Sequence, residues 1–334
     1  MKIGIALAIF NPNLDFLSDQ LKSLIHQSHL DWECVLSDES TDPIVSRQAE
    51  QLSGLDPRFR WVRRQELPRG PAANFEYALN QLSASCEVFA FCDQDDIWEP
   101  QKLERLLELL EKKPAAPLVH SDLSLIDGKG QMIATSCWQM EKRNFAHNSS
   151  LLELVLRNRV TGCTMIFRKD LLNLALPFPK EVHGAYLHDH WVASLGLILG
   201  PAVDCGEPLV QYRQHGGNVV GASDLGWWPS LARIFRAAIF FKTKADAAFR
   251  VRYKLAKDLR DRIQERKPES LHFVEVELET FLKPRRLLFF RGLRGAKFMT
   301  QEFLIWLLLN LSFHDLSVGS AIDSASVDDQ FGTL

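Results

Sequence analysis

An unbroken apolar run that ends in three carboxylates constrains this chain more than any other feature. Residues 88–92, Val-Phe-Ala-Phe-Cys, are followed by Asp93, Asp95 and Asp96. Such a run is typical of a buried strand in a parallel sheet, and open α/β sheets bind ligands outside the carboxyl ends of such strands. If the chain stays extended, Asp93 and Asp95 face one side and Asp96 faces the other. The run therefore predicts a central strand with a ligand site at its end.

The closeness of these carboxylates indicates a metal site. Two carboxylates side by side in a pocket repel each other and retain protons unless a cation lies between them. Oxygen ligands suit Mg²⁺ or Mn²⁺, and these ions take further oxygens from a diphosphate. The alternative is a solvated acidic turn that caps the helix beginning near Glu99 and Pro100. For Asp96 both interpretations stay open.

Strands and helices alternate through the first half of the chain, and the pattern becomes irregular after Pro117. Strands are predicted over residues 3–9, 32–36, 59–62 and 88–92, with helices over 14–27, 71–82 and 102–110. This alternation implies right-handed βαβ units and a mostly parallel sheet, the architecture of nucleotide-binding α/β domains. Further strands over 118–120, 132–138, 161–167, 203–205 and 209–213, with helices over 151–156 and 189–199, predict a mixed second half.

Composition is that of an ordinary folded protein, with 46% hydrophobic and 24% charged residues among 334. The six cysteines form no C-x-x-C pair, which favours free thiols in a reducing compartment over disulfides or zinc. Residues 1–7 lead directly into a strand, without the basic segment or cleavage site of a signal peptide. These features predict a cytoplasmic location.

Two polar residues in the first half are candidates for contact with a nucleotide. Asp38 lies just past the second strand, where its carboxylate can accept from a base N–H or a ribose hydroxyl. The alternative is a turn-forming aspartate in a loop of Ser, Thr and Asp. Asn74, four residues after Gly70, either contacts a nucleotide or lies in the first turn of its helix.

Two further clusters lie in the second half. Asp189 stands between His188 and His190 at the start of an apolar helix, where it can serve as a general base; the alternative is a helix N-cap. The H-x-H spacing does not predict zinc, because no third nitrogen or sulfur ligand is near in the sequence. In residues 212–218, His215 can complete a metal shell and Arg213 can pair with phosphate oxygens. The alternative for His215 is a solvated loop residue.

Small residues at the start of a predicted strand, Thr161-Gly162-Cys163, allow the backbone to approach a ligand closely. The alternative is tight packing inside the protein. Cys163 is not predicted to be a nucleophile, because no base is paired with it in the sequence.

The order of these segments resembles family 2 glycosyltransferases over residues 1–222. Within that family it is most similar to the bacterial rhamnosyltransferase-like branch that builds O-antigen and capsular polysaccharides. The segments that carry the resemblance are Phe10-Asn11, residues 38–42, residues 70–75, residues 93–98, residues 161–163, His188-Asp189 and residues 212–215. One difference lies at residues 37–42, where S-D-E-S-T-D replaces the usual D-D-G-S-T-D. The missing glycine leaves the partner of Asp38 open.

The resemblance implies a GT-A fold: a mixed α/β sheet flanked by helices. It also implies a divalent metal and inverting transfer from a nucleotide-sugar donor, with dTDP-rhamnose favoured and a UDP-sugar as the alternative. The implied acceptor is a polyprenyl-linked saccharide. By position, Asp189 would be the catalytic base, and Asp95 and His215 would bind the metal. The donor would contact Phe10, Asn11, Asp38, Asn74, Asp93 and Arg213, and the acceptor side would include Thr161, Gly162 and Trp191.

Two rival functions come from other classes. A sugar-nucleotide pyrophosphorylase would share the sheet and the metal carboxylates. It would normally carry a glycine-rich phosphate loop with a basic residue after the first strand, which residues 10–13 lack. A catalytically inactive scaffold at the membrane is the second rival. The presence of Asp93, Asp95 and Asp189 argues against it.

Residues 223–334 are predicted to form a separate helical appendage. Residues 225–300 carry 18 basic and 8 acidic side chains, whereas residues 1–224 carry 21 and 29. Basic helices interleaved with aromatic residues bind anionic membrane surfaces. The apolar run 303–309 is shorter than the ~20 residues needed to span a bilayer.

We therefore expect peripheral attachment to the inner face of the cell membrane. The alternative is packing of the appendage on the main domain or on a second subunit of a homo-oligomer. Nucleic acid is not an expected partner, because the acidic main domain would repel phosphate and no recognition motif is present.

The membrane prediction is checked by flotation with anionic liposomes. The full chain is expected to float with them at low salt, and a chain without residues 225–334 is expected to stay behind, because the basic block supplies the attraction. Equal recovery of both chains at the bottom of the gradient would instead favour the packing alternative.

Overall fold

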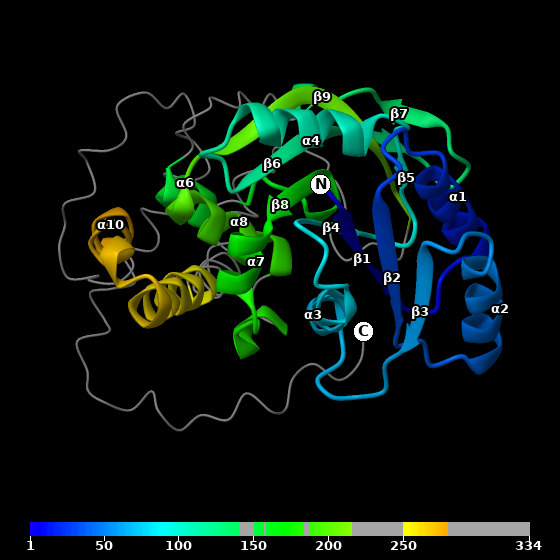
Figure 1. Ribbon diagram of the computed structural model, residues 1–334, viewed down its shortest axis with the longest axis horizontal. Helices are drawn as coiled ribbons and strands as arrows, with labels where there is room; N and C mark the ends of the chain where they lie inside the picture. Colours follow the sequence, from blue (N-terminus) through cyan, green and yellow to red (C-terminus); the bar gives the residue numbers. More distant parts are fainter. Residues whose placement is uncertain (141–149, 157, 184–186, 216–249, 280–334) are drawn as a thin grey trace, which may run out of the picture. The chain divides into compact units, whose positions relative to one another are not determined.

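The computed structural model describes residues 1–140, 150–156, 158–183, 187–215 and 250–279 (Figure 1). The predicted alternation in the first half is confirmed. Its elements are β1 (Ile3–Ile9), α1 (Leu14–Ile25), β2 (Trp32–Asp38), α2 (Pro43–Ser53), β3 (Phe59–Arg63), α3 (Pro71–Gln81) and β4 (Val88–Cys92).

The second half differs from the prediction in several places. Its elements are β5 (Ile97–Trp98), α4 (Lys102–Lys112), β6 (Leu118–Ile126), β7 (Met132–Ala134), α5 (Cys137–Met140), α6 (Leu151–Leu156), the 3-10 helix η1 (Gly162–Thr164), β8 (Met165–Arg168), α7 (Lys169–Ala175), η2 (Lys180–His183), α8 (His188–Leu199) and β9 (Ala202–Arg213). The strand predicted over 132–138 is the short β7 followed by the helical turn α5. The two strands predicted over 203–213 are one strand, β9. The start of the strand predicted at Thr161 is the turn η1.

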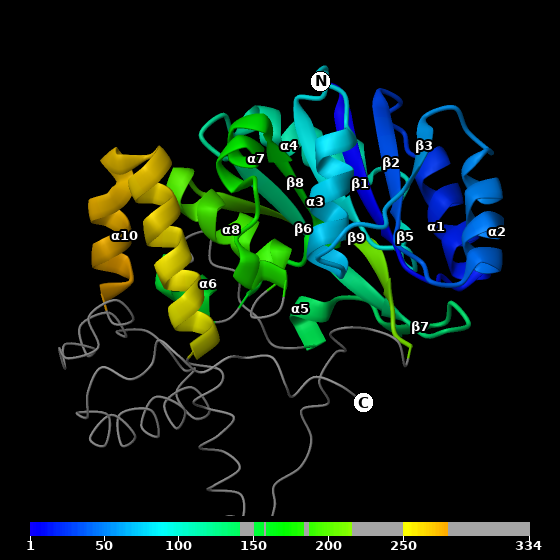
Figure 2. The same cartoon turned by 90° about the horizontal axis from the view of Figure 1, so that it is seen from below.

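The strands form a mixed sheet in the order β3-β2-β1-β4-β8-β6-β9-β5, with β7 paired to β6. The first four are parallel, whereas β8 runs antiparallel to both β4 and β6. Helices α1, α2 and α4 lie on one face, and α3, α7 and α8 lie on the other (Figures 1 and 2). After β1 the chain continues to β2, which pairs with one edge of β1, whereas β4 pairs with the other edge. This is the switch point beside which open α/β sheets bind ligands.

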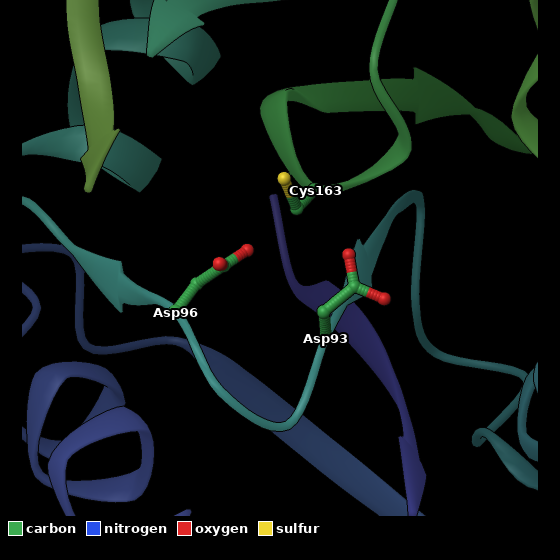
Figure 3. Close-up of side chains that lie close together, drawn as sticks. All are labelled: Asp93, Asp96 and Cys163. Carbon is green, nitrogen blue, oxygen red and sulfur yellow. The ribbon is translucent and has the colours of Figure 1, made fainter. Parts of the chain in front are cut away.

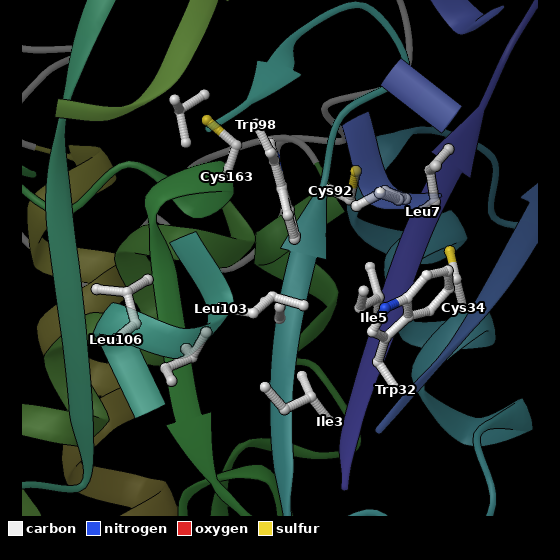
Figure 4. Close-up of a cluster of buried hydrophobic side chains, with 14 of the residues drawn as sticks. Ile3, Ile5, Leu7, Trp32, Cys34, Cys92, Trp98, Leu103, Leu106 and Cys163 are labelled. Atoms are coloured by element: carbon white, nitrogen blue, oxygen red, sulfur yellow. The ribbon is translucent and has the colours of Figure 1, made fainter. Parts of the chain in front are cut away.

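The central strand β4 is buried on both faces, which explains its unbroken apolar sequence. Val88, Ala90 and Cys92 pack into the cluster that includes the apolar faces of α1 and α4 (Figure 4). Phe89 and Phe91 point to the other face, where each contacts the ring of Phe167, with centroids 6.1 and 5.2 Å away. Full burial of such a side chain contributes about 1.5–3 kcal/mol, so the end of β4 has a firmly packed base.

Side-chain caps start the helices directly after β1 and β2. The Asn13 carboxamide oxygen accepts the N–H groups of Asp15 and Phe16 at 3.0 and 3.2 Å. The Asp42 carboxylate does the same for α2, which has proline in its first turn. Each loop between strand and helix is therefore only four residues long, and its position is fixed at both ends.

Part of the C-terminal region packs on the sheet domain. Residues 252–279 belong to the same compact unit as the sheet, and they contain η3 (Pro268–Ser270) and α10 (Leu271–Glu277). The Arg262 guanidinium donates to the Leu174 and Ala175 carbonyls at the end of α7, at 2.7 and 2.9 Å. Residues 252–279 thus pack as the alternative describes, while the domain boundary near residue 222 and attachment to a membrane stay predictions.

The aromatic and basic residues at 227–249 and 280–300, and the apolar run 303–309, lie outside the described residues. Among the helices that the structure describes, none has the length and apolar character needed to cross a membrane.

Candidate active site

The carboxyl ends of β1, β2 and β4 meet at one edge of the sheet. In the strand register, Ile9 of β1 lies opposite Asp38 of β2, and Leu7 lies opposite Cys92 of β4. The loops 10–13, 39–42 and 93–96 therefore emerge side by side. Residues that are far apart in the sequence can act together at this edge.

Asn11 joins the loop after β1 to the loop after β2. Its backbone has a φ of 39°, in the left-handed region that asparagine tolerates better than most residues. Its Oδ1 accepts the N–H groups of Thr41 and Asp42 at 3.0 and 3.1 Å, and its own N–H donates to the Ser40 hydroxyl at 2.7 Å. Asn11 thus shapes the edge, and its predicted contact with a donor stays a prediction.

Phe10 joins the same loop to the acidic loop after β4. Its N–H donates to Gln94 Oε1 at 2.9 Å, and Gln94 Nε2 donates back to the Phe10 carbonyl at 3.2 Å. The Phe10 side chain is half exposed. An aromatic surface is therefore present at the edge where the predicted donor would lie.

The Asp38 carboxylate is fully buried and engaged inside the protein. Its Oδ1 accepts the Ser40 N–H at 2.8 Å, which confirms the turn-forming alternative. Its Oδ2 accepts from the Ser46 hydroxyl and from the Arg63 guanidinium in very short contacts. A base-binding role would require one of these partners to give way, and it stays a prediction.

Glu39, which stands where the family has glycine, has a structural role that the sequence did not reveal. Its buried carboxylate accepts the Gly70 N–H at 3.0 Å and pairs with the Arg64 guanidinium at 3.0 Å. Gly70 precedes α3 with a φ of 115°, a conformation that favours glycine. Glu39 therefore ties the loop after β2 to the start of α3. No local pattern signals this contact, because its partners are 25 and 31 residues away.

Asn74 lies in the first turns of α3, as one of its two interpretations predicts. It is almost fully buried, and its Nδ2 donates to the Ile9 carbonyl at the end of β1 at 3.0 Å. Its Oδ1 is buried without a hydrogen-bond partner among the described residues. A donor contact for Asn74 stays a prediction.

Asp93, Asp96 and Cys163 converge beyond the end of β4 (Figure 3). One side-chain ligand atom of each lies within 4.8 Å of the others. Because β8 runs antiparallel to β4, the turn η1 that precedes β8 arrives at the carboxyl end of β4. The sheet topology thus brings Cys163 to the acidic loop.

Two expectations for this loop are wrong. The chain bends at Gln94 and Asp95 and does not stay extended, so Asp93 and Asp96 lie together and not on opposite sides. Asp96 also does not cap the following helix, whose N-cap is Gln101. The fully buried Asp96 carboxylate instead accepts the Arg213 N–H of β9 at 3.1 Å.

Asp95 and His215, predicted to share a metal, lie in contact. Asp95 Oδ2 and His215 Nε2 are 2.7 Å apart, and both side chains are partly exposed. The His215 ring also packs against Phe16, with centroids 5.5 Å apart. A carboxylate oxygen suits Mg²⁺ or Mn²⁺, and histidine is the commonest metal ligand, so the pair fits a divalent cation.

Arg213 is buried below this pair, and its contacts differ from those expected of a phosphate ligand. Its Nε donates to the Asp95 carbonyl at 2.9 Å, and its Nη2 pairs with Asp19 at 3.2 Å. Its guanidinium lies 4.4 Å from the centre of the Phe16 ring. These contacts fix the backbone that carries Asp95. A phosphate contact stays a prediction.

Asp189 lies at the start of α8, next to the turn η1. Its Oδ2 accepts the Gly162 N–H at 3.1 Å and its Oδ1 accepts the His190 N–H at 2.6 Å. A Cβ on residue 162 would come within 3.3 Å of Asp189 Cβ and 3.0 Å of His188 Nε2, so a side chain there would crowd both residues. The N-cap alternative for Asp189 is wrong, because the N-cap of α8 is Leu187.

His188, His190 and Trp191, the residues next to Asp189 in the sequence, make their contacts inside the protein. The His188 ring packs against the rings of Phe75 and Phe91, with centroids 4.3 and 4.6 Å away, the second in an edge-on arrangement. His190 contacts the Leu154 carbonyl at 2.7 Å. Trp191, predicted on the acceptor side, is fully buried, and its indole N–H donates to the Ala175 carbonyl at 3.1 Å. Because α8 turns Trp191 into the core, a contact with an acceptor would require the side chain to become exposed, and the acceptor-side role stays a prediction.

Lys102 is a second residue that the sequence did not single out. It is fully buried, and its Nζ donates to the Cys163 carbonyl at 2.5 Å. Burial lowers its pKa to about 7, although Cys163, Cys92, Asp96 and Asp93 favour its charged form. Lysine at the start of an amphipathic helix normally indicates an exposed position. In the sequence, only its position on the apolar face of the helix, one residue before Leu103, indicated that Lys102 could be buried.

Burial governs the charges in this site. It raises the pKa of Asp93 to about 7, with further increases from the charges of Asp95 and Asp189. It also raises the pKa of Asp189 to about 6, although N–H donors oppose the change, and it raises the pKa of Asp96 well above its usual range. Crowded carboxylates retain protons unless a cation joins them. The electrostatics of the acidic loop therefore favour the binding of a cation.

The sequence is similar to those of known glycosyltransferases. The glycosyl transferase family 2 model matches residues 5–174. An uncharacterized glycosyltransferase, alr2836 of Nostoc, is 28% identical over 65% of this chain, and the match spans 66% of that relative's length. WfgD of Escherichia coli, a UDP-Glc:alpha-D-GlcNAc-diphosphoundecaprenol beta-1,3-glucosyltransferase, is 26% identical over 59% of this chain and 71% of its own.

Among solved structures, the mannosyltransferase PcManGT of Pyrobaculum calidifontis, in complex with GDP-Man and Mn²⁺, has a TM-score of 0.51. The similarity covers 93% of this chain and 80% of that one, at 13% identity. Identity this low shows the fold alone, and the fold is GT-A, as predicted.

The raised pKa of Asp93 predicts a pH-dependent gain in stability for Asp93→Asn. Between about pH 4 and pH 7 the folded protein holds a proton that the unfolded chain releases, so this carboxyl's contribution to stability falls as pH rises. Without divalent cations the variant is expected to match the native protein near pH 4 and to exceed it by roughly 1–3 kcal/mol at pH 8. Urea unfolding at both pH values measures this. Equal differences at both would contradict it.

Proposed function

The chain is a member of glycosyl transferase family 2, and we propose that it transfers a sugar from a nucleoside-diphosphate donor to a hydroxyl group with inversion at the anomeric carbon. The observation that carries the proposal is the placement of Asp189 beside the acidic loop. The turn η1 links the two: its Gly162 N–H donates to Asp189 Oδ2 at 3.1 Å, and its Cys163 side chain lies close to Asp93 and Asp96. A carboxylate beside the proposed donor site can take the proton of an incoming hydroxyl.

Asp189 has the properties that a general base needs. Its pKa of about 6 leaves it ionised at neutral pH and makes it a stronger proton acceptor than a solvated aspartate. The N–H groups of Gly162 and His190 hold both of its oxygens, so its orientation is set before an acceptor arrives. Thr161 and Gly162 lie on the same turn and form the acceptor side in this proposal.

Asp95 and His215 would hold Mg²⁺ or Mn²⁺. When bound there, the cation would neutralise negative charge on the departing diphosphate. The protein's own contribution is orientation, because Arg213 holds the Asp95 carbonyl and Phe16 supports the His215 ring. The Mn²⁺ in the mannosyltransferase of the same fold supports a divalent metal.

The donor would lie across the three loops at the edge of the sheet. Phe10 offers a half-exposed ring for the base, and Asp93 lies where a ribose hydroxyl could be held. Asn11, Asp38, Asn74 and Arg213 complete the proposed donor contacts. The resemblance to the rhamnosyltransferase branch makes dTDP-rhamnose the favoured donor, with a UDP-sugar as the alternative.

A polyprenyl-linked saccharide is the proposed acceptor. The E. coli relative acts on a diphosphoundecaprenol-linked sugar, which supports this class of acceptor. Such an acceptor is held in a membrane, so the protein is proposed to work at the inner face of the cell membrane, attached by the basic residues after 225.

Asp189→Asn tests the base directly. The rate of donor turnover is expected to fall about 10²–10⁴-fold, because the amide cannot accept the proton. Binding of UDP with Mn²⁺ should stay within about twofold of native, because Asp189 is not a proposed nucleotide ligand. Sugar-nucleotide hydrolysis and calorimetry measure the two quantities. Asp170→Asn, an exposed carboxylate on α7, is the matched control, and near-native turnover by Asp189→Asn would exclude this base.

Asp95→Asn tests the metal site. The affinity for Mn²⁺ in the presence of UDP is expected to fall by at least about tenfold, because an anionic ligand is lost. Paramagnetic resonance titration of free Mn²⁺ measures this. His215→Gln should weaken binding in the same direction. Unchanged Mn²⁺ affinity in both variants would place the metal elsewhere.

A further inference from the structure

Lys102 is buried in an unusual place for a lysine. It is the first residue of α4, it has no exposed surface, and its Nζ lies 3.0 Å from the centre of the Trp98 ring. Its ammonium donates to the Cys163 carbonyl at 2.5 Å. Burial of an ammonium group is costly unless the surrounding contacts offset the cost. The contact with Cys163 therefore needs a reason beyond packing.

The carbonyl that Lys102 holds belongs to the turn that orients Asp189. Residues 161–164 are closed by the Thr164 N–H donating to the Thr161 carbonyl at 3.0 Å. In the middle of this turn, the Gly162 N–H donates to Asp189 Oδ2 at 3.1 Å. A Cβ at residue 162 would lie 3.3 Å from Asp189 Cβ, so the turn and the carboxylate are in close contact. A shift of the turn would therefore move or release the carboxylate.

The side chain of Lys102 also lies near the acidic loop. The charges of Asp96 and Asp93 both favour its charged form. One simple alternative is that Lys102 serves only as a counter-ion inside the core. The hydrogen bond to a backbone carbonyl distinguishes the two roles, because a counter-ion alone would pair with a carboxylate, and the structure shows no such ion pair among the described residues.

We propose that Lys102 is a positioning residue for the catalytic base: it fixes the turn at residues 161–164, and through the Gly162 N–H it sets the orientation of the Asp189 carboxylate. This inference rests on the proposed function, since it assigns Lys102 to the same reaction. It adds a residue on α4, 87 positions before Asp189 in the chain, to the machinery that activates the acceptor.

The test compares Lys102→Met, which keeps the alkyl chain and removes the ammonium group, with Lys112→Met on the exposed end of the same helix. Hydrolysis of UDP-glucose and dTDP-rhamnose is measured with Mn²⁺. For Lys102→Met, kcat is expected to fall about 10- to 100-fold, while KM for the donor stays within about twofold. Lys112→Met should retain native values. A rise in donor KM with unchanged kcat would overturn the proposal.

A double variant separates positioning from a general loss of structure. If Lys102 acts through Asp189, adding Lys102→Met to Asp189→Asn should lower kcat by less than about twofold. A further 10-fold or greater loss would show an independent effect and overturn the proposal. If Lys102→Met fails to fold, Lys102→Leu replaces it, with the same expectations and the same contrary outcomes.

Hydrogen exchange of residues 161–165 gives a measurement that does not depend on activity. Exchange should be faster in Lys102→Met than in the native protein or Lys112→Met, because the turn loses its anchor. Unchanged exchange would overturn the proposal. A native protein that hydrolyses no donor, together with faster exchange in the variant, would count against the proposed function while supporting the anchoring of the turn.

Discussion

Buried carboxylates at the end of β4 impose the constraint on which this site depends. An ionised carboxylate loses much of its solvation when it is buried, and neighbouring carboxylates add repulsion. The protein offsets these costs with oriented N–H donors, from Arg213 to Asp96 and from Gly162 and His190 to Asp189, and with the charge of Lys102 nearby. These groups come from α4, η1, α8 and β9. The carboxylates therefore have all of them nearby only in the folded domain.

The same constraint explains why the central part of the fold could be predicted from the sequence. Burial of β4 on both faces demands apolar residues throughout, so the apolar run at residues 88–92 predicts the strand. The abrupt change to Asp93 predicts where the strand ends. The caps at Asn13 and Asp42 are equally local signals. The family resemblance then supplied the residues at the edge, and the structure places Asp95 against His215 and Asp189 beside the turn at Gly162.

Features that depend on contacts between distant segments could not be predicted in this way. Lys102 and Glu39 look like surface residues in the sequence, and their buried partners lie 61 and 25 positions away. Trp191 looks like part of the reactive cluster, because sequence adjacency to Asp189 hides the fact that α8 turns successive side chains to different sides. The extended geometry assumed for Asp93 and Asp95 failed for a related reason. The bend at Gln94 is stabilised by a reciprocal pair with Phe10, 84 residues earlier.

The long strand β9 has a consequence for how this protein folds during its synthesis. It delivers the Arg213 N–H to Asp96, and the chain just beyond it brings His215 to Asp95, across 117 and 120 residues of sequence. During synthesis, β1 to β4 can pair long before β9 leaves the ribosome, so the acidic loop waits without its final partners. The acidic loop therefore acquires these partners only when β9, the last strand among the described residues, joins the sheet.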